Sequence, residues 1–214
     1  MQASFWQQKW QNNELGFHLP EPHPKLVRHI KRLGLKPGDR VFLPLCGKSL
    51  DIAWLLQQGF RVVGAEWVQQ AVEQLFTELD VEPVISRQGE LRRYSAQQLD
   101  IFVGDIFTLD AETLGAVDAV YDRAALVALP TDKRALYSRH LATISGCAPQ
   151  LLISFEYDQS QLSGPPFSVP PEEVRGHYQD MFSLELLESK AIKGGLKGKC
   201  PADEQAWLLS AKSQ

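Results

Sequence analysis

The stretch from Asp39 to Asp51, which reads DRVFLPLCGKSLD, constrains the fold of this chain more than any other. Its apolar residues at 41–43 are typical of a buried strand. A proline, a turn with one glycine and an apolar segment with helical spacing follow. In open α/β sheets, the crevice beyond the carboxyl end of such a strand binds nucleotide-like ligands, because helix N–H groups and strand ends meet there. We therefore expect a ligand crevice at this turn.

Strands and helices alternate along the rest of the chain, which predicts an α/β fold with a mostly parallel sheet. The expected strands lie at 41–43, 61–66, 99–103, 116–122, 151–157, 182–187 and 206–210, and the expected helices at 24–33, 50–56, 68–79, 131–144 and 172–178. The last two strands are joined by a loop too short for a crossover helix, so we expect them to pair antiparallel. A hairpin is possible around Gln88 and Gly89. We expect a single domain spanning residues 1–214.

Residues 1–23 are expected to form a lid or cover over this domain. Phe5, Trp6 and Trp10 have a spacing that suits a short helix in a polar background. The prolines that follow, up to Pro24, exclude a continuous helix, so this part should lie as an extended connector. The segment has neither the basic nor the apolar region of a signal peptide.

Composition excludes several classes of partner. The net charge is −4, and the one basic cluster, at 190–199, contains three glycines and no aromatic residue, which is typical of a solvated loop rather than a nucleic-acid platform. No apolar run approaches the roughly 20 residues that a membrane-spanning helix needs. The three cysteines form no CxxC pair for a metal ion. We therefore expect a cytoplasmic monomer that binds a small molecule, without nucleic acid, membrane or metal.

An acidic residue marks the end of the second expected strand. Glu66 follows Gly47 at close to the ~20-residue spacing at which a carboxylate accepts hydrogen bonds from ribose hydroxyls in dinucleotide folds. The turn itself is neither GxGxxG nor GxxxxGK[ST], so it lacks a cradle for a diphosphate. A ligand with a diol and no diphosphate remains, and S-adenosylmethionine is one. Its sulfonium is tolerated near Glu66 and near aromatic faces such as Trp10, and Arg123 could pair with its carboxylate.

A family resemblance rests on several long blocks in order. They read FWxxKW near the N-terminus, GFH at 16–18, VFLPLCGKSLDxxWLxxxG at 41–59, VxGxE at 62–66, GDIF at 104–107, YDRAALVALP at 121–130 and GPPFxVP at 164–170. The chain resembles the bacterial thiopurine S-methyltransferases over nearly its whole length. The resemblance implies a class I methyltransferase fold: a Rossmann-like, seven-stranded, mostly parallel sheet with helices on both faces and the last strand antiparallel.

The same resemblance implies the cofactor and the residues that contact it. S-adenosylmethionine is the expected cofactor, bound by Trp10, Leu45, Glu66, Asp105, Ile106 and Arg123, and Phe17 is expected to face the acceptor. His18 and Phe167 are further candidates for acceptor contact, although His18 could instead cap the connector. The implied activity is methyl transfer to the sulfur of thiopurines and of aromatic or heterocyclic thiols. Methylation of selenium or tellurium oxyanions is the alternative substrate class. From the residues alone, a nucleotide-dependent oxidoreductase and a non-catalytic binding module stay open.

Each candidate also has a structural explanation. Cys46 is a small thiol of the kind that packs in turns, and Asp105 could simply cap the turn after it. Arg123 could form an ion pair with Asp122, and Trp6 could anchor the N-terminal helix. Because no Ser/His/Asp or Cys/His arrangement is present, we expect no single side chain to act as a general base. Alignment of the reactants would then supply most of the rate.

Overall fold

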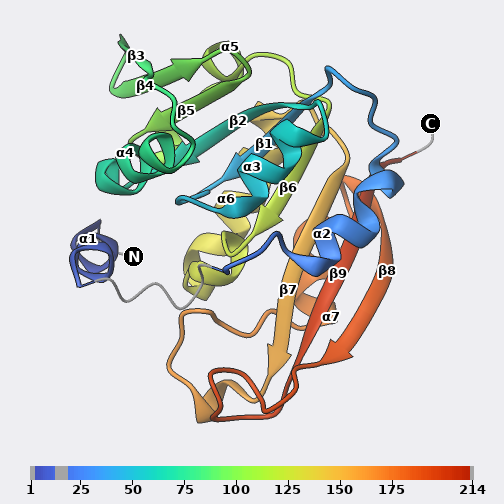
Figure 1. The fold of residues 1–214 in the computed structure, drawn as a ribbon. Helices are drawn as coiled ribbons and strands as arrows, with labels where there is room; N and C mark the ends of the chain where they lie inside the picture. The colour runs from blue at the N-terminus through green and yellow to red at the C-terminus, as the bar shows by residue number, and fades with distance from the viewer. Residues whose placement is uncertain (1–2, 13–18, 213–214) are drawn as a thin grey trace.

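A computed structural model describes residues 3–12 and 19–212 of the chain. Its centre is a nine-stranded sheet in the order β3-β4-β5-β2-β1-β6-β7-β9-β8 (Figure 1). The strands are β1 (Arg40–Pro44), β2 (Arg61–Glu66), β3 (Val84–Gln88), β4 (Leu91–Ala96), β5 (Leu99–Val103), β6 (Ala119–Arg123), β7 (Gln150–Tyr157), β8 (Phe182–Ala191) and β9 (Ala202–Ala211). The α-helices are α1 (Ala3–Gln11), α2 (Pro24–His29), α3 (Leu50–Gln57), α4 (Gln69–Glu78), α5 (Ala111–Leu114), α6 (Thr131–Ile144) and α7 (Pro171–Tyr178). Short 3₁₀ turns are η1 (Ile30–Leu33), η2 (Ile106–Thr108), η3 (Leu126–Ala128) and η4 (Gln159–Gln161).

The middle of the sheet is parallel, as the alternating pattern predicted. β1 lies between β2 and β6, and β5 and β7 extend the parallel set on either side. Their carboxyl ends therefore meet at one edge, because crossover helices return the chain to the opposite edge each time. β9 is inserted antiparallel between β7 and β8, which confirms the predicted antiparallel pairing of the last two strands.

The strand count differs from the expected seven. All seven expected strands are present, and the hairpin of β3 and β4 pairs with the outer edge of β5 and brings the sheet to nine. Gly89 takes a positive φ of 60° in the hairpin turn. Every residue of β3 is exposed. An edge strand that buries no face has no apolar alternation to mark it in the sequence, so the count of seven was too low.

Helices cover both faces of the sheet (Figure 1). On one face α2, α3 and α4 bury Leu26, Ile52 and Val72 against β1, β2 and β5. On the other face α6 and α7 bury Leu141 and Val174 against β6, β7 and β9. The two apolar layers enclose the central strands, which explains why those strands read as continuous apolar runs.

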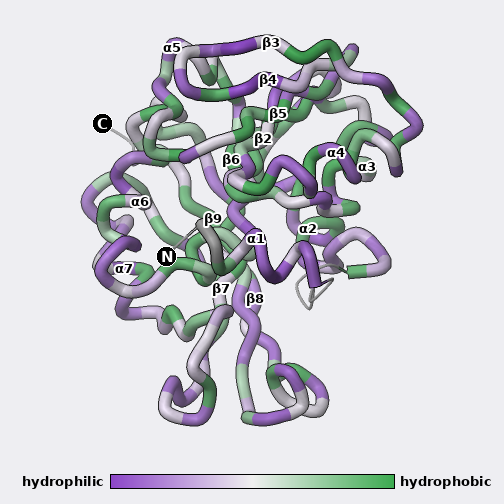
Figure 2. Tube along the Cα trace, turned by 90° about the vertical axis from the view of Figure 1, so that its left-hand side faces the viewer, coloured by the Kyte–Doolittle hydropathy of each residue, from purple (hydrophilic) through white to green (hydrophobic). Residues whose placement is uncertain are grey.

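Two loops extend from the end of the sheet beside β7 and β8 (Figures 1 and 2). The Lys197 Nζ atom donates a hydrogen bond to the Pro165 carbonyl at 2.7 Å, which ties the loop after β8 to the proline-rich loop after β7. Leu196 and Cys200 are buried against Tyr157. The basic loop is thus only partly the solvated segment that its composition indicated: its lysines are exposed, and it packs through two apolar side chains.

Within the described residues, none of the helices combines the length and the apolar character needed to cross a bilayer.

Candidate functional site

A cleft of about 1130 Å³ opens over the carboxyl ends of the parallel strands. Its walls come from the turn after β1, the ends of β2, β5, β6 and β7, helix α1 and the two tied loops. Five of the predicted cofactor residues, from the strand ends, line it together with Trp10 from α1: Leu45, Glu66, Asp105, Ile106 and Arg123. The fold therefore brings residues far apart in the chain to one surface, as expected where parallel strands end.

A backbone hydrogen bond ties the turn after β1 to β2. The Cys46 amide donates to the Ala65 carbonyl at 3.0 Å, which continues the pairing of β1 and β2 into the turn. Leu45 and Gly47 take positive φ angles of 48° and 54°. A left-handed conformation at a leucine costs of order 1 kcal/mol and persists only where surrounding contacts enforce it. Strain of this kind is concentrated at ligand sites.

Glu66 is one of the contacts that enforce this turn. Its two carboxylate oxygens accept hydrogen bonds from the Gly47 amide at 2.7 Å and the Val68 amide at 2.8 Å. Burial raises the pKa of Glu66, and these amide donors partly oppose the shift. A carboxylate has about four acceptor positions, so these amide hydrogen bonds leave Glu66 with acceptor capacity. A buried carboxylate with spare acceptor capacity suits a ligand that presents two hydroxyl groups.

Cys46 lies beside Glu66 without the properties of a nucleophile. Burial and the nearby Glu66 carboxylate raise the pKa of its thiol well above the usual value. The thiolate is the reactive form, so a thiol held neutral is unreactive. Cys46 packs in the apolar layer with β1 and β2, in line with a packing role.

Asp105 and Ile106 lie where β5 ends. The Asp105 carboxylate accepts a hydrogen bond from the Phe107 amide at 3.0 Å and caps η2, so the capping role considered for this residue is present. Ile106 is buried, and its carbonyl lies 2.8 Å from Nε2 of His140. Both residues line the cleft, which leaves Asp105 able to serve a ligand as well as the cap.

At the end of β6, the side chains of Asp122 and Arg123 point to opposite faces of the sheet. Successive strand residues face opposite sides of a sheet, and Asp122 is buried with Tyr137 while Arg123 and Tyr121 line the cleft. The Asp122 carboxylate accepts hydrogen bonds from the Tyr137 hydroxyl and the Leu126 amide. The ion pair between Asp122 and Arg123 that the sequence left open is therefore not what holds Asp122.

The N-terminal helix closes one side of the cleft. Trp10 is 4% exposed and packs on Val68 and Ala71 at the start of α4, with Trp6 against them. Trp6 and Trp10 also line the cleft. One pair of indoles therefore both anchors α1 and forms cleft wall.

The three predicted acceptor residues have different outcomes. Phe17 and His18 lie outside the described residues. Phe167 is not among the described residues that line the cleft: its ring stacks 5.5 Å from the Arg134 guanidinium, and its amide donates to the Val127 carbonyl at 2.7 Å. Its neighbours Pro165 and Pro166 do line the cleft. Contact between Phe167 and an acceptor stays a prediction.

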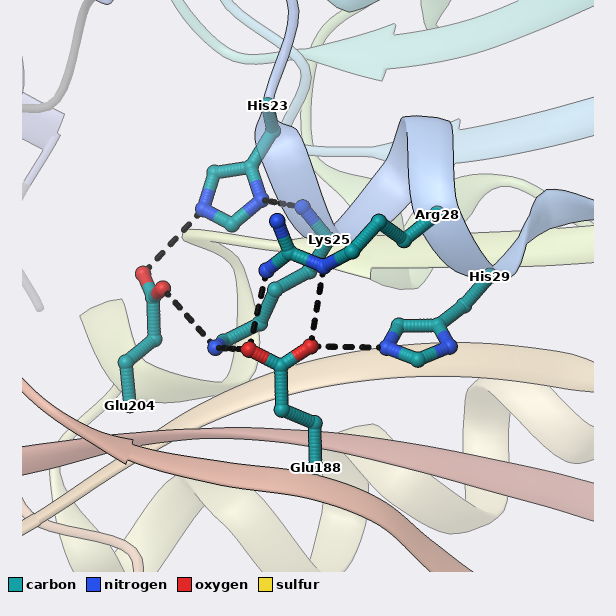
Figure 3. A network of polar contacts seen from close by, with 6 residues as sticks. All are labelled: His23, Lys25, Arg28, His29, Glu188 and Glu204. Atoms are coloured by element: carbon teal, nitrogen blue, oxygen red, sulfur yellow. Dashed lines mark hydrogen bonds and ion pairs between the residues drawn. The ribbon is translucent and has the colours of Figure 1, made fainter.

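Sequence reasoning missed a polar network on the side of the cleft next to α2 (Figure 3). Nε2 of His23 lies 3.1 Å from Glu204, and Nζ of the buried Lys25 lies 2.8 Å from Glu188 and 3.6 Å from Glu204. The His23 amide donates to Asp51 at 2.6 Å. His23, Lys25, Asp51 and Glu204 all line the cleft. They come from α2 and the residue that caps it, from α3 and from β9, and they share no sequence motif, so only the tertiary fold reveals them.

The donor set fits an uncharged diol and does not fit a metal ion. Among residues 3–12 and 19–212, no group of three or more His, Cys, Asp or Glu side chains is placed to hold a metal. The single-glycine turn at Gly47 directs its amide to Glu66 and so is not a free phosphate cradle. The carboxylate at the end of β2, the strained turn and the arginine at the end of β6 together suit an adenosine-like ligand with a charged amino-acid tail.

Comparison with known proteins gives one consistent family. The family model for Thiopurine S-methyltransferase matches residues 1–203. A thiopurine S-methyltransferase of Xanthobacter autotrophicus is 55% identical over 98% of this chain and 99% of its own length. One of Gluconobacter oxydans is 50% identical over 97% of this chain and 94% of its own.

Solved structures share the fold at low identity. A Burkholderia thailandensis 1,6-didemethyltoxoflavin-N1-methyltransferase, solved with S-adenosylhomocysteine, superposes with a TM-score of 0.66 at 15% identity, covering 97% of this chain and 87% of that one. A TehB-like methyltransferase from Corynebacterium glutamicum gives a TM-score of 0.58 at 13% identity over 98% of both chains. At such identities the likeness shows the fold alone.

Proposed function

Because this chain belongs to the thiopurine S-methyltransferase family, we propose that it transfers the methyl group of S-adenosylmethionine to the sulfur of thiopurines and of other aromatic or heterocyclic thiols. The chain is a methyltransferase by family. The thiol acceptor is the further step proposed here. The observation that carries the cofactor assignment is the Glu66 carboxylate, fixed by two backbone amides beside a turn that has no phosphate cradle.

Six residues are proposed to hold the cofactor. Glu66 would accept hydrogen bonds from the ribose hydroxyls, and Asp105 with Ile106 would border the adenine. The backbone from Leu45 to Gly47 and the Arg123 guanidinium would contact the methionine end, with Trp10 closing over it. All of them line the same cleft, which supports their acting on one ligand.

When bound, S-adenosylmethionine would supply an electrophilic methyl group, to which the acceptor thiolate would bond in line as the methyl–sulfonium bond breaks and S-adenosylhomocysteine leaves. The chain's own contribution is alignment and exclusion of water, because indole, proline and aliphatic side chains form a large part of the cleft wall. Two candidate bases in the cleft wall are already hydrogen-bonded: Nδ1 of His23 accepts from the Lys25 amide, and Asp51 accepts from the His23 amide and from the Tyr121 hydroxyl at 3.2 Å. This pairing supports the expectation that no single side chain acts as the general base.

A methyl-transfer screen with labelled S-adenosylmethionine tests the proposal. Thiopurines, aryl thiols, selenite and tellurite would be compared at saturating cofactor, with release of S-adenosylhomocysteine as the readout. We expect turnover of the thiols to exceed that of the oxyanions. Preferred turnover of selenite or tellurite would replace the thiol assignment by the oxyanion alternative. Binding of NAD in preference to S-adenosylhomocysteine would instead favour an oxidoreductase.

A further inference from the structure

The turn after β6 is a second strained segment of the cleft wall. Ala124 has a φ of 61°, in the left-handed region that alanine rarely adopts. Arg123 and Ala124 line the cleft, and so do Val127 and Ala128 in η3, three and four residues after Ala124. The shape of this wall therefore depends on what holds residues 123–126 in place.

Asp122 is the side chain that holds them. It is fully buried, and its Oδ1 accepts a hydrogen bond from the Leu126 amide at 3.1 Å while its Oδ2 accepts from the Tyr137 hydroxyl at 2.8 Å. The first bond closes the loop from residue 122 to residue 126. The second bond fixes the carboxylate to α6. The position of the turn therefore depends on this long helix as well as on the backbone of the turn itself.

We propose that Asp122 is a positioning residue for the cofactor: its hydrogen bonds to Leu126 and Tyr137 hold Arg123 and the strained Ala124 against the cleft. This inference rests on the proposed function, because it assumes that S-adenosylmethionine lies against this wall. Asp122 itself does not line the cleft. It acts only through the turn.

The protonation of Asp122 gives a way to distinguish a positioning role from a purely structural one. Burial raises the pKa of Asp122 to about 6, against the opposing hydrogen bonds from Leu126, Tyr137 and Ala125. The titratable groups that face it are Tyr137 from α6 and Tyr178 from α7, and burial raises the pKa of both phenols well above the usual value. Both phenols stay neutral, and only Tyr137 of the two donates to the carboxylate, since the buried Tyr178 hydroxyl has no hydrogen-bond partner among the described residues. A protonated Asp122 would meet the Tyr137 and Leu126 donors with an O–H of its own and would lose part of its hold on the turn.

The cofactor affinity should therefore follow the ionisation of Asp122. Binding of S-adenosylhomocysteine would be measured by titration calorimetry between pH 5 and 8 on the full chain, with thermal unfolding recorded at each pH. We expect the wild-type affinity to fall roughly tenfold as the pH drops through the range where Asp122 gains its proton, the effect of one charged hydrogen bond. Asp122→Asn should bind roughly tenfold more weakly at pH 7.5 and show no such step, because its neutral amide does not titrate.

Two further variants keep the test decisive. Tyr137→Phe removes a donor that favours the ionised carboxylate, so the midpoint of the affinity step should move to higher pH. Asp100→Asn is the matched control: Asp100 is also a hydrogen-bonded carboxylate, held by Arg93 and Ser95 on the β5 side of the sheet, and it does not line the cleft. It should keep the wild-type pH profile.

The outcomes separate this inference from the proposed function. If Asp122→Asn and Tyr137→Phe only lower the unfolding temperature and keep the wild-type affinity profile, Asp122 is structural and the inference is wrong. If Asp122→Asn does not fold, the midpoint in Tyr137→Phe decides alone. A folded wild-type protein that fails to bind S-adenosylhomocysteine at pH 7.5 would overturn the proposed function, and this inference with it.

Discussion

Among single residues, Glu66 uses one carboxylate both to hold the turn after β1 and to form part of the cleft wall. It holds the amides of Gly47 and Val68, which fixes the turn after β1 to the start of α4, and it lies in the cleft wall with acceptor capacity to spare. Its buried position raises its pKa, and the two amides lower it again in part. Loss of the negative charge should therefore disturb both the turn and the ligand.

Substitution Glu66→Gln tests this double role. The amide can accept hydrogen bonds at only one of its two terminal atoms, so one backbone N–H would be left facing another donor. We expect affinity for S-adenosylhomocysteine to fall about 10- to 100-fold, the range for a lost hydrogen bond to a charged group, as measured by calorimetry. Glu73→Gln is the control, because Glu73 is exposed on α4, accepts a hydrogen bond from Gln69 and does not line the cleft. An unchanged affinity in Glu66→Gln would contradict the assignment of the ribose contact.

Among the elements, β2 depends on a glycine for reasons of packing. Gly64 pairs with Leu43 on β1 and with Ile101 on β5. A Cβ atom there would lie 2.6 Å from Cδ1 of Ile101 and 2.7 Å from Sγ of Cys46. Gly64 therefore leaves room for Cys46, which links the interior of the strand to the cleft turn.

Substitution Gly64→Ala should be destabilising, because the new methyl group overlaps two buried side chains. We expect a loss of about 1 to 3 kcal/mol in the free energy of unfolding, measured by urea denaturation. Gly176→Ala on α7 is the opposite case: nothing lies within 4 Å of its Cβ position, so alanine should be neutral or stabilise by up to about 1 kcal/mol. Equal stability of Gly64→Ala and wild type would show that the contact relaxes without cost.

Across the whole molecule, the polar network of Figure 3 joins the N-terminal part of the chain to its last strands. Glu188 on β8 accepts hydrogen bonds from Lys25, Arg28 and His29 on α2. Burial alone would raise the pKa of Glu188, but these hydrogen bonds lower it to about 2. Its contribution to stability is therefore complete above its ordinary pKa near 4.5 and is lost as the pH falls toward 2. Asp122 has the opposite sign, because its pKa is raised.

Substitution Glu188→Gln should be costly because Lys25 is buried and would keep only the more distant Glu204 as a partner. We expect a loss of about 2 to 3 kcal/mol in the free energy of unfolding at pH 7, somewhat below the cost of breaking a fully buried pair. Stability should also decline less between pH 5 and pH 2 than in wild type. Glu185→Gln is the matched control on the same strand, since its pair with Arg32 is about half exposed and should be worth less than about 1 kcal/mol. Equal losses in the two variants would contradict this ranking.

The parallel sheet and the cleft position were predictable because they depend on local patterns. Buried strands such as β2 have an apolar centre, at residues 62–65, and the turn at Gly47 separates a strand from a helix within a few residues. Glu66 and Arg123 could be selected as site residues because strand ends in a parallel sheet share one edge. The possible hairpin at 84–96 was not included among the expected strands of the sheet, because its outer strand buries no side chain and has no apolar pattern.

The sequence by itself determined the α/β alternation, the cleft edge and the strand-end residues, because periodicity and turns are read from neighbours in the chain. Only the tertiary structure decided which groups pair across long separations: Lys25 with Glu188, His23 with Glu204, and Asp122 with Tyr137 rather than with the adjacent Arg123. Such pairs form only when distant elements pack, and no local pattern encodes them.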